Sequence, residues 1–276
     1  MTAEPRSWLF VPADSEKKIA RALDCGADAI IFDLEDSVAP SAKVSAREIV
    51  KTLPASDATQ LWVRVNPFAS EWHGEDLEVF ANSAIHGVVL PKAESGSDVI
   101  GLAQRLGSST PIHAIVTETA ASLFGLLSYR GAPNLAAMSW GAEDLSADLG
   151  ASSKLDENGK LSFTYRMARS LCLAGARAAG VQPVDGVFTD FRDEPGLIIE
   201  ALAAAREGFT GKLAIHPAQV GPINEAFSPS AEEIAHAQAM VDAFAAQPDA
   251  GVLSIEGRMV DRPHLTQATR VLSRAR

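Results

Sequence analysis

Charged residues follow several apolar runs of this sequence, and their types are those that bind a metal ion together with an organic acid. They are Asp33 and Glu35, Arg64, Lys92, Glu118, and Glu143 with Asp144. Carboxylates are ligands that hard cations such as Mg²⁺ prefer, and an arginine can hold a carboxylate through two parallel hydrogen bonds. This set predicts a site where a cation and an arginine bind an oxyanionic substrate.

Glu118 and Asp144 are the candidate ligands for the cation. They lie at or just beyond the ends of the fifth and sixth predicted strands, so their carboxylates can meet at one metal ion. Acids at this position also cap the helices that follow, and the pair taken alone favours capping. Arg64 favours the metal site, because a metal-bound substrate carboxylate also needs a cationic clamp. The alternative for Arg64 is a structural ion pair with Asp33 or Glu35.

Asp33, Glu35 and Lys92 each have more than one interpretation. The two acids point to the same side of their strand, and two carboxylates held together need a cation or a shared proton. We expect them to tune each other or to hold metal-bound water. Lys92 is either an ion-pair partner for Glu94 or for an acid of the site, or the Schiff-base nucleophile of a metal-free aldolase. We expect the ion pair.

The elements that must position these residues are eight strand-like runs that alternate with helical stretches, a pattern that favours parallel pairing. The runs are Ser7–Val11, Ala29–Glu35, Leu61–Asn66, Gly87–Pro91, Ile112–Glu118, Leu135–Gly141, Gly186–Asp190 and Lys212–His216. Most are apolar at first and end in polar residues, as strands buried on both faces do when their carboxyl ends form a site. We therefore expect an α/β fold, a (β/α)8 TIM barrel with its site at the C-terminal rim. An open doubly wound sheet is the rival, but it does not need polar residues at nearly every strand end.

The chain divides into a predicted barrel domain, residues 1–222, and a C-terminal helical or flap extension, residues 223–276. The long connection Asp144–Pro183 contains a polar stretch, Ser152–Lys160, that reads as a loop or lid. A helix near Ala231–Ala246, an intervening segment and a final helix make up the extension. Its size suggests a flap or an exchange with a neighbouring subunit.

Composition excludes several functional classes. The 276 residues are 47% hydrophobic and carry a formal net charge of -11, which argues against nucleic-acid binding and against broad attachment to anionic membranes. Cys25 and Cys172 match no metal spacing, and no signal or membrane-spanning segment is predicted, so we expect a cytoplasmic protein. Phosphate-loop, dinucleotide-binding, His-Glu-x-x-His and nucleophile-elbow sequences are all missing.

A series of short motifs, in order along nearly the whole chain, resembles the citrate lyase beta-subunit-like branch of the HpcH/HpaI aldolase family. They are Arg6-Ser-Trp-Leu-Phe-Val-Pro12, Phe32-Asp-Leu-Glu-Asp-Ser-Val38, Val63-Arg-Val-Asn66, Leu90-Pro-Lys92, Glu118-Thr-Ala120, Gly141-Ala-Glu-Asp-Leu145, Asp185-Gly-Val-Phe-Thr-Asp190, Ala214-Ile-His-Pro217 and Gly257-Arg-Met-Val-Asp-Arg-Pro263. The resemblance implies a TIM barrel of the phosphoenolpyruvate/pyruvate superfamily that forms a homotrimer or a hexamer. It also implies Mg²⁺-dependent cleavage or formation of a C–C bond in malyl-, citramalyl- or citryl-type thioesters, giving a 2-oxo acid and an acyl thioester.

The resemblance assigns roles to individual residues. Glu118 and Asp144 become the Mg²⁺ ligands, and Arg64 holds the substrate carboxylate. Asp261 becomes the group that exchanges a proton with the acetyl-type carbon, presented over a neighbouring subunit's site. Two stretches depart from the family: Pro12-Ala13-Asp14 replaces a Pro-Gly start, and Ser15–Lys18 varies where some relatives contact coenzyme A.

For the resulting lyase mechanism, we expect two supporting sets of groups. Backbone N–H groups of Gly141, Ala142 and Glu143 help to bind the carboxylate of the 2-oxo acid, and Asp33 and Glu35 support metal-bound water. Three alternatives are open: an acyl-CoA thioesterase with the same metal site, a subunit of a citrate lyase complex, and a metal aldolase acting on free 2-oxo acids.

Overall fold

Eight parallel strands close into a barrel in the computed structural model, which describes residues 4–81, 84–107, 109–255 and 257–275. The strands are β1 (Ser7–Pro12), β2 (Ala29–Asp33), β3 (Gln60–Arg64), β4 (Gly87–Leu90), β5 (Ile112–Ile115), β6 (Leu135–Ser139), β7 (Gln182–Asp185) and β8 (Gly211–Ala214). Each strand pairs with the next in sequence, and β8 pairs with β1. The predicted TIM barrel is confirmed, and the doubly wound sheet is excluded.

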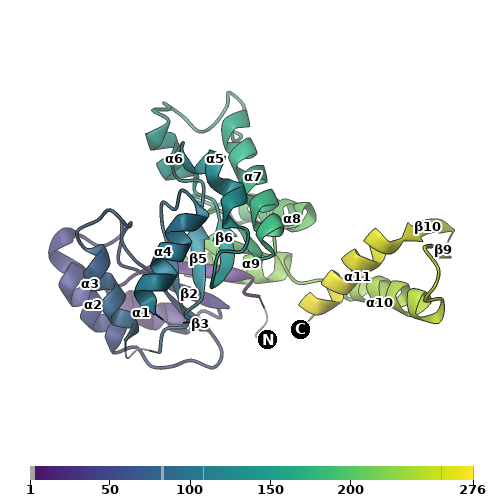
Figure 1. Ribbon diagram of the computed structural model, residues 1–276, viewed down its shortest axis with the longest axis horizontal. Helices are drawn as coiled ribbons and strands as arrows, with labels where there is room; N and C mark the ends of the chain where they lie inside the picture. The colour runs from purple at the N-terminus through teal and green to yellow at the C-terminus, as the bar shows by residue number, and fades with distance from the viewer. Residues whose placement is uncertain (1–3, 82–83, 108, 256, 276) are drawn as a thin grey trace.

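Helices cover the outside of the barrel (Figure 1). They are α1 (Glu16–Leu23), α2 (Lys43–Lys51), α3 (His73–Leu77), α4 (Gly96–Leu106), α5 (Ser122–Gly125), α6 (Ala142–Asp148), α7 (Phe163–Ala179), α8 (Glu194–Glu207) and α9 (Val220–Ala226). Short 3-10 helices complete the connections: η1 (Pro40–Ala42), η2 (Glu78–Phe80), η3 (Leu126–Tyr129) and η4 (Pro217–Gln219). Among the described residues, no helix is long and apolar enough to cross a membrane.

The seventh strand was predicted wrongly. The structure places it at Gln182–Asp185, whereas Gly186–Asp190 follows it as irregular chain. Proline is disfavoured within strands because it lacks a backbone donor, yet Pro183 is the second residue of this one. In the barrel, Pro183 pairs in register with Met138, and its carbonyl accepts a hydrogen bond from the Thr210 backbone N–H at 3.0 Å.

Side chains that point into the barrel form two levels. Trp8, Trp62 and His113 fill the lower level, with ring centroids of Trp8 and Trp62 5.0 Å apart. Two residues further along their strands, Phe10 and Arg64 point the same way because side chains alternate. This packing supports the polar groups of the C-terminal rim from below.

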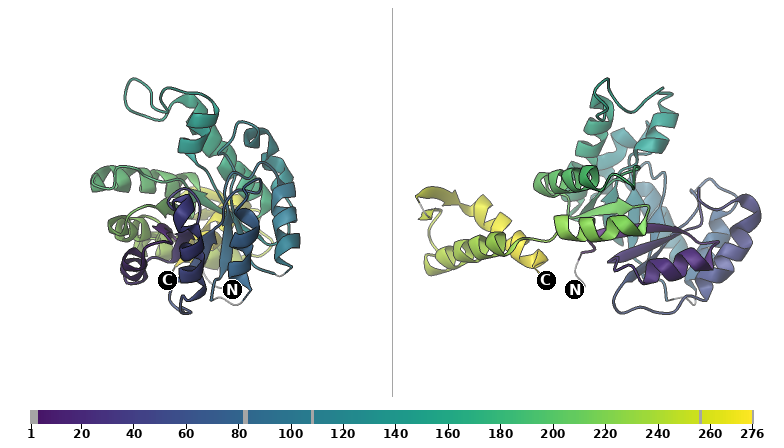
Figure 2. Two further views of the ribbon diagram at one scale, coloured as in Figure 1. Left: turned by 90° about the vertical axis from the view of Figure 1, so that its left-hand side faces the viewer. Right: turned by 180° about the vertical axis from the view of Figure 1, so that it is seen from behind.

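The C-terminal extension has a small core of its own. It contains α10 (Ala231–Ala246), the antiparallel strands β9 (Val252–Ile255) and β10 (Arg258–Asp261), and α11 (Arg262–Arg274). Figures 1 and 2 show it projecting to one side of the barrel, with the β9–β10 hairpin at its far end. The division predicted after residue 222 falls inside α9, whose Ile223 packs in the barrel core together with Phe227. We therefore propose that the barrel domain extends through Phe227.

Candidate active site

Arg64 and Asp33 lie side by side at the rim because their strands pair in register. The Arg64 Nε and one terminal nitrogen each donate to an Asp33 carboxylate oxygen at 2.7 Å, and the guanidinium stacks 4.7 Å from the centroid of the Phe10 ring. Burial alone raises the pKa of Asp33, but the Arg64 charge and hydrogen bonds hold that pKa below its ordinary value. Asp33 is therefore an ionised anchor for Arg64.

Glu35 links this pair to Lys92. One of its carboxylate oxygens lies 2.9 Å from an Arg64 nitrogen and the other 2.6 Å from Lys92 Nζ. The Glu35 side chain is buried, and burial raises its pKa against the opposing effect of the two cations. Asp33 accepts the Glu35 backbone N–H at 2.9 Å, which fixes the turn that carries Glu35.

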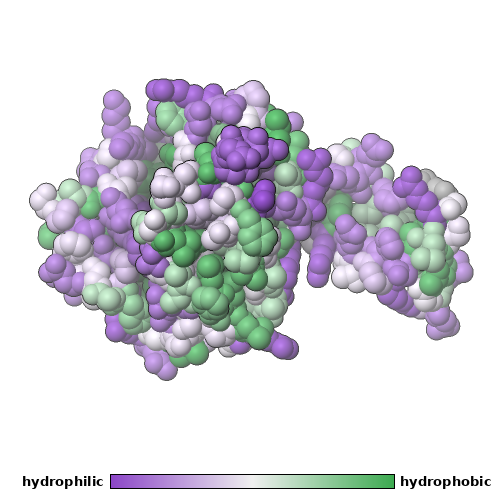
Figure 3. All heavy atoms as spheres, turned by 90° about the horizontal axis from the view of Figure 1, so that it is seen from above, coloured by the Kyte–Doolittle hydropathy of each residue, from purple (hydrophilic) through white to green (hydrophobic). Residues whose placement is uncertain are grey.

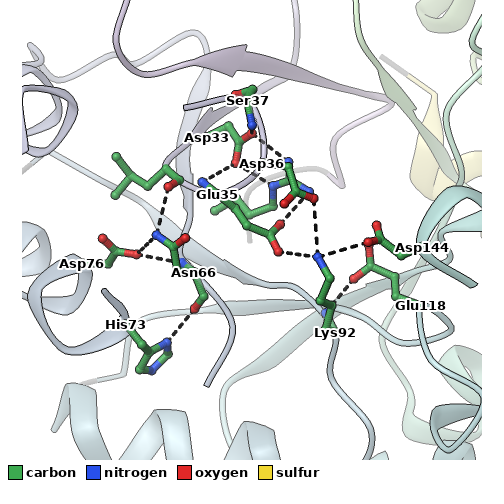
Figure 4. Close-up of polar contacts among 12 residues, drawn as sticks. Asp33, Glu35, Asp36, Ser37, Asn66, His73, Asp76, Lys92, Glu118 and Asp144 are labelled. Atoms are coloured by element: carbon green, nitrogen blue, oxygen red, sulfur yellow. Dashed lines mark hydrogen bonds and ion pairs between the residues drawn. The ribbon is translucent and has the colours of Figure 1, made fainter. Parts of the chain in front are cut away.

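Lys92 connects both groups of acids, as Figure 4 shows. Its Nζ lies 3.2 Å from Asp144 Oδ1 and 3.4 Å from Asp36 Oδ2 in addition to its contact with Glu35. Burial disfavours the charged ammonium, but the surrounding carboxylates raise its pKa overall. A Schiff-base lysine needs a lowered pKa, so the structure favours the expected ion pair.

The backbone of Lys92 holds Glu118. Lys92 has a φ of 50°, a left-handed conformation that is uncommon for a residue with a side chain. Its backbone N–H donates to Glu118 Oε2 at 2.6 Å. This bond occupies one carboxylate oxygen and leaves Oε1 available to a cation.

Glu118 and Asp144 lie next to each other at the ends of β5 and β6 (Figure 4). Burial raises the pKa of Glu118 to about 8, and the neighbouring Asp144 charge contributes to the rise. Asp144 lies in the first turn of α6, but no side chain caps that helix. Glu118 and Asp144 both contact Lys92 instead, so the capping alternative is not what the structure shows.

These two carboxylates fit the needs of Mg²⁺. In the part of the chain that the structure describes, no group of three or more His, Cys, Asp or Glu side chains is arranged to hold a metal ion. Mg²⁺ commonly binds one or two protein carboxylates and takes its other oxygens from water and substrate. The buried, charge-crowded Glu118 is also the type of carboxylate that a bound cation would stabilise.

Gly141, Ala142 and Glu143 begin α6 beside Glu118. A Cβ added to Gly141 would lie 2.8 Å from Glu118 Cγ, so the glycine makes room for this carboxylate. The Glu143 side chain is exposed and forms an ion pair with Lys154 of the loop before α7. Only the backbone of Glu143 is thus left for the predicted contact with substrate.

Asp261 does not join the other site residues within the chain. It ends β10 and begins α11, and its carboxylate Oδ1 lies 2.5 Å from His264 Nδ1 of the same extension. This hydrogen bond lowers the pKa of Asp261. Figure 1 shows β10 at the end of the extension, away from the barrel.

A buried network behind Glu35 escaped the sequence analysis. Lys43 Nζ donates to the Leu34 carbonyl at 2.7 Å and to Asn66 Oδ1 at 2.9 Å, and Asp76 accepts from Asn66 in turn. Lys43 is almost fully buried and ties the end of β2 to the end of β3. The only sequence signal was Asn66 at a strand end, because a helical lysine is ordinarily exposed.

Comparisons with known proteins agree with this geometry. Residues 6–217 match the family model described as HpcH/HpaI aldolase/citrate lyase, and residues 168–276 match a C–C bond lyase model of the TIM-barrel fold. A (3S)-malyl-CoA thioesterase of Cereibacter sphaeroides is 37% identical over 98% of this chain and 94% of its own length. The human mitochondrial citramalyl-CoA lyase is 35% identical over 98% of this chain and 85% of its own. A crystal structure of CitE from Mycobacterium tuberculosis with magnesium, acetoacetate and coenzyme A has a TM-score of 0.84 and 38% identity, covering 99% of this chain and 98% of that one.

Proposed function

Because this chain belongs to the HpcH/HpaI aldolase/citrate lyase family, we propose that it is a Mg²⁺-dependent C–C lyase acting on malyl-, citramalyl- or citryl-type thioesters. The reaction releases, or in reverse condenses, a 2-oxo acid and an acyl thioester. One observation carries the proposal: a largely buried arginine and a pair of adjacent carboxylates share one rim of the barrel. That combination binds a cation and a substrate carboxylate at the same place.

We propose that Glu118 and Asp144 hold the metal and that Arg64 holds the substrate carboxylate. When bound, Mg²⁺ supplies Lewis-acid stabilisation of the oxygen that becomes the 2-oxo group. A guanidinium has five N–H donors, and the two hydrogen bonds to Asp33 use one on Nε and one on a terminal nitrogen. Three donors therefore remain for the substrate, and the other terminal nitrogen also lies 2.9 Å from a Glu35 carboxylate oxygen.

The other groups of the rim orient these ligands. Lys92 fixes Glu118 through its backbone and contacts Asp144 through its ammonium. Asp33 and Glu35 hold Arg64 in one orientation, and we propose that they also support metal-bound water. The backbone N–H groups of Gly141, Ala142 and Glu143 would add donors for the 2-oxo acid.

We propose that Asp261 acts on the site of a neighbouring subunit in a homotrimer or hexamer. Its place on a projecting extension supports this, since it lies apart from the rim of its own chain. Exposed apolar side chains on α5, η3 and α7 also support assembly: Phe124, Leu127 and Phe163 are 93%, 73% and 69% exposed. Large apolar side chains with this much exposure are typical of subunit interfaces.

A thioesterase with the same site is the second candidate, and the malyl-CoA thioesterase among the relatives favours it. In that case water attacks the thioester carbonyl, and the products are a hydroxy acid and a free thiol. A citrate lyase subunit would need partner chains for turnover, and an aldolase for free 2-oxo acids would be indifferent to coenzyme A. A cytoplasmic location stays a prediction, supported by the free thiols of Cys25 and Cys172.

The test is a screen of malyl-, citramalyl-, β-methylmalyl- and citryl-CoA with the purified chain, with and without Mg²⁺, in which 2-oxo acid and free thiol are both measured. We expect Mg²⁺-dependent release of 2-oxo acid without free thiol. Free thiol in equal yield with hydroxy acid would identify a thioesterase. Lack of turnover by the chain alone, followed by turnover with partner subunits, would identify a complex subunit.

A further inference from the structure

An arginine-rich cavity lies between the barrel and the extension, at the end of the barrel opposite the proposed active site. Its volume is about 860 Å³, and its lining includes the last turns of α7 and α8, Thr210 before β8, and one side of α11. In Figures 1 and 2 the C-terminal end of α11 is the part of that helix nearest the barrel. Figure 3 shows hydrophilic side chains gathered at this junction.

The lining is positively charged although the chain as a whole is acidic. Arg6 is paired with Asp28, and Glu207 with Arg169, so neither leaves a free charge. The lining contains one further acid, Glu4, and four further arginines: Arg177, Arg206, Arg270 and Arg274. None of the four forms an ion pair with a carboxylate among the described residues.

Helix ends account for only part of this charge. Arg177, Arg206 and Arg274 lie in the last turns of α7, α8 and α11, where a cation is favourable. Each helix end carries roughly half a negative charge, so three ends and Glu4 offset about 2.5 of the four positive charges. Arg177 also lies near Arg270 and Arg274, and burial together with these two charges lowers its pKa. The cluster therefore retains like-charge repulsion.

Two donors of the lining have no hydrogen-bond partner among the described residues. The Thr210 hydroxyl is buried within a residue that is 7% exposed, and Arg274 Nε is buried as well. Buried polar atoms are ordinarily paired, because leaving one unpaired costs about 1–3 kcal/mol. The lining is therefore short of acceptor oxygens, and an anion in the cavity would supply such oxygens and relieve the repulsion between the arginines.

We propose that this cavity is a second ligand site, specific for a small molecule that carries a phosphate or diphosphate group. Its volume is within the roughly 300–1,000 Å³ of small-molecule sites, and arginine is well suited to phosphate oxygens. Arg177 and Arg206 belong to the barrel, whereas Arg270 and Arg274 belong to the extension. A bound phosphate compound therefore bridges the two parts and holds α11 against the barrel.

The test is calorimetric titration of the full-length protein, without Mg²⁺, with pyrophosphate, orthophosphate and adenosine 3′,5′-bisphosphate. We expect saturable pyrophosphate binding at one site per chain. The double variant Arg270→Gln/Arg274→Gln should weaken it at least tenfold, and Thr210→Val severalfold, whereas Arg130→Gln should bind as the wild type does. Arg130 is an exposed arginine outside the cavity and serves as the matched control.

The three ligands distinguish the sources of the phosphate. Tighter binding of the bisphosphate than of pyrophosphate identifies an adenosine-bearing ligand, and the reverse order identifies a free diphosphate. The proposal is overturned if the wild type shows no saturable binding, or if the double variant and Thr210→Val both bind pyrophosphate as tightly as the wild type. The second result would place the anion elsewhere, for example at the proposed active site.

Discussion

Gly141→Ala is the substitution that best tests the position of the proposed metal ligand Glu118, because it displaces that side chain without straining the backbone. Gly141 has φ −127° and ψ 123°, which alanine adopts without strain. The added methyl group, however, would lie 2.8 Å from Glu118 Cγ and 3.1 Å from Oε1. Since carbon atoms pack at about 3.5–4.0 Å, Glu118 must move by roughly 1 Å.

That displacement acts directly on the proposed Mg²⁺ site. Glu118 is buried, and its Oε2 is held by the Lys92 N–H at 2.6 Å, so the carboxylate can move only by breaking this bond or crowding its neighbours. A misplacement of 1 Å costs on the order of 100-fold in rate, or about 2.7 kcal/mol in the barrier. We expect kcat/KM to fall 10- to 100-fold and the Mg²⁺ concentration for half-maximal activity to rise, with an overpacking cost of about 1–3 kcal/mol in stability.

The assay is 2-oxo acid release against Mg²⁺ concentration, combined with thermal unfolding. Gly74→Ala is the control, because Gly74 is exposed in α3, a Cβ there meets nothing within 4 Å, and a helix favours alanine over glycine. It should keep wild-type kinetics. Wild-type Mg²⁺ dependence and turnover in Gly141→Ala would refute the placement of the metal at Glu118.

Three further predictions concern charge and pH. Without Mg²⁺, Glu118→Gln should be up to about 3 kcal/mol more stable than the wild type at pH 7. Burial raises the pKa of Glu118 from 4.5 to about 8, so the folded wild type loses stability as pH rises between these values. Equal unfolding free energies for the two proteins across this range would contradict the prediction. Burial lowers the pKa of His113 to about 3, so below pH 6.5 only the unfolded chain takes up a proton there. The unfolding free energy of the wild type should therefore fall by about 2 kcal/mol between pH 7.5 and 5 from this residue. Urea unfolding of His113→Gln should lack this contribution to the pH dependence. Arg64→Lys keeps the charge but loses the paired bonds to Asp33, and we expect substrate KM to rise at least tenfold; an unchanged KM would show that Arg64 only stabilises the barrel.

Much of the rim could be predicted from sequence because neighbouring strands of a barrel are also neighbours along the chain. Asp33 and Arg64 end consecutive strands, so parallel pairing alone places them side by side. The same reasoning applies to Glu118 and Asp144, which follow β5 and β6. Apolar runs with polar ends were sufficient to locate most of the strands.

Contacts that depend on unusual backbone or on tertiary packing were beyond the sequence pattern. The bond from Lys92 to Glu118 requires a positive φ, which no residue type near Lys92 indicates. Pro183 lies in a central strand against its own propensity, because the barrel supplies pairing on both sides. The burial of Lys43 likewise depends on acceptors from two separate strand ends.

The most direct test of the proposed active site is the rate of 2-oxo acid release by Glu118→Gln over a range of Mg²⁺ concentrations. Glutamine keeps the shape and the acceptor for the Lys92 N–H but removes the charge that would bind the cation. We predict a rate below about 1% of the wild type at every Mg²⁺ concentration, as expected when a group that stabilises the transition state is lost. Cleavage at the wild-type rate, with the wild-type dependence on Mg²⁺, would contradict the assignment of Glu118 and Asp144 as the metal site.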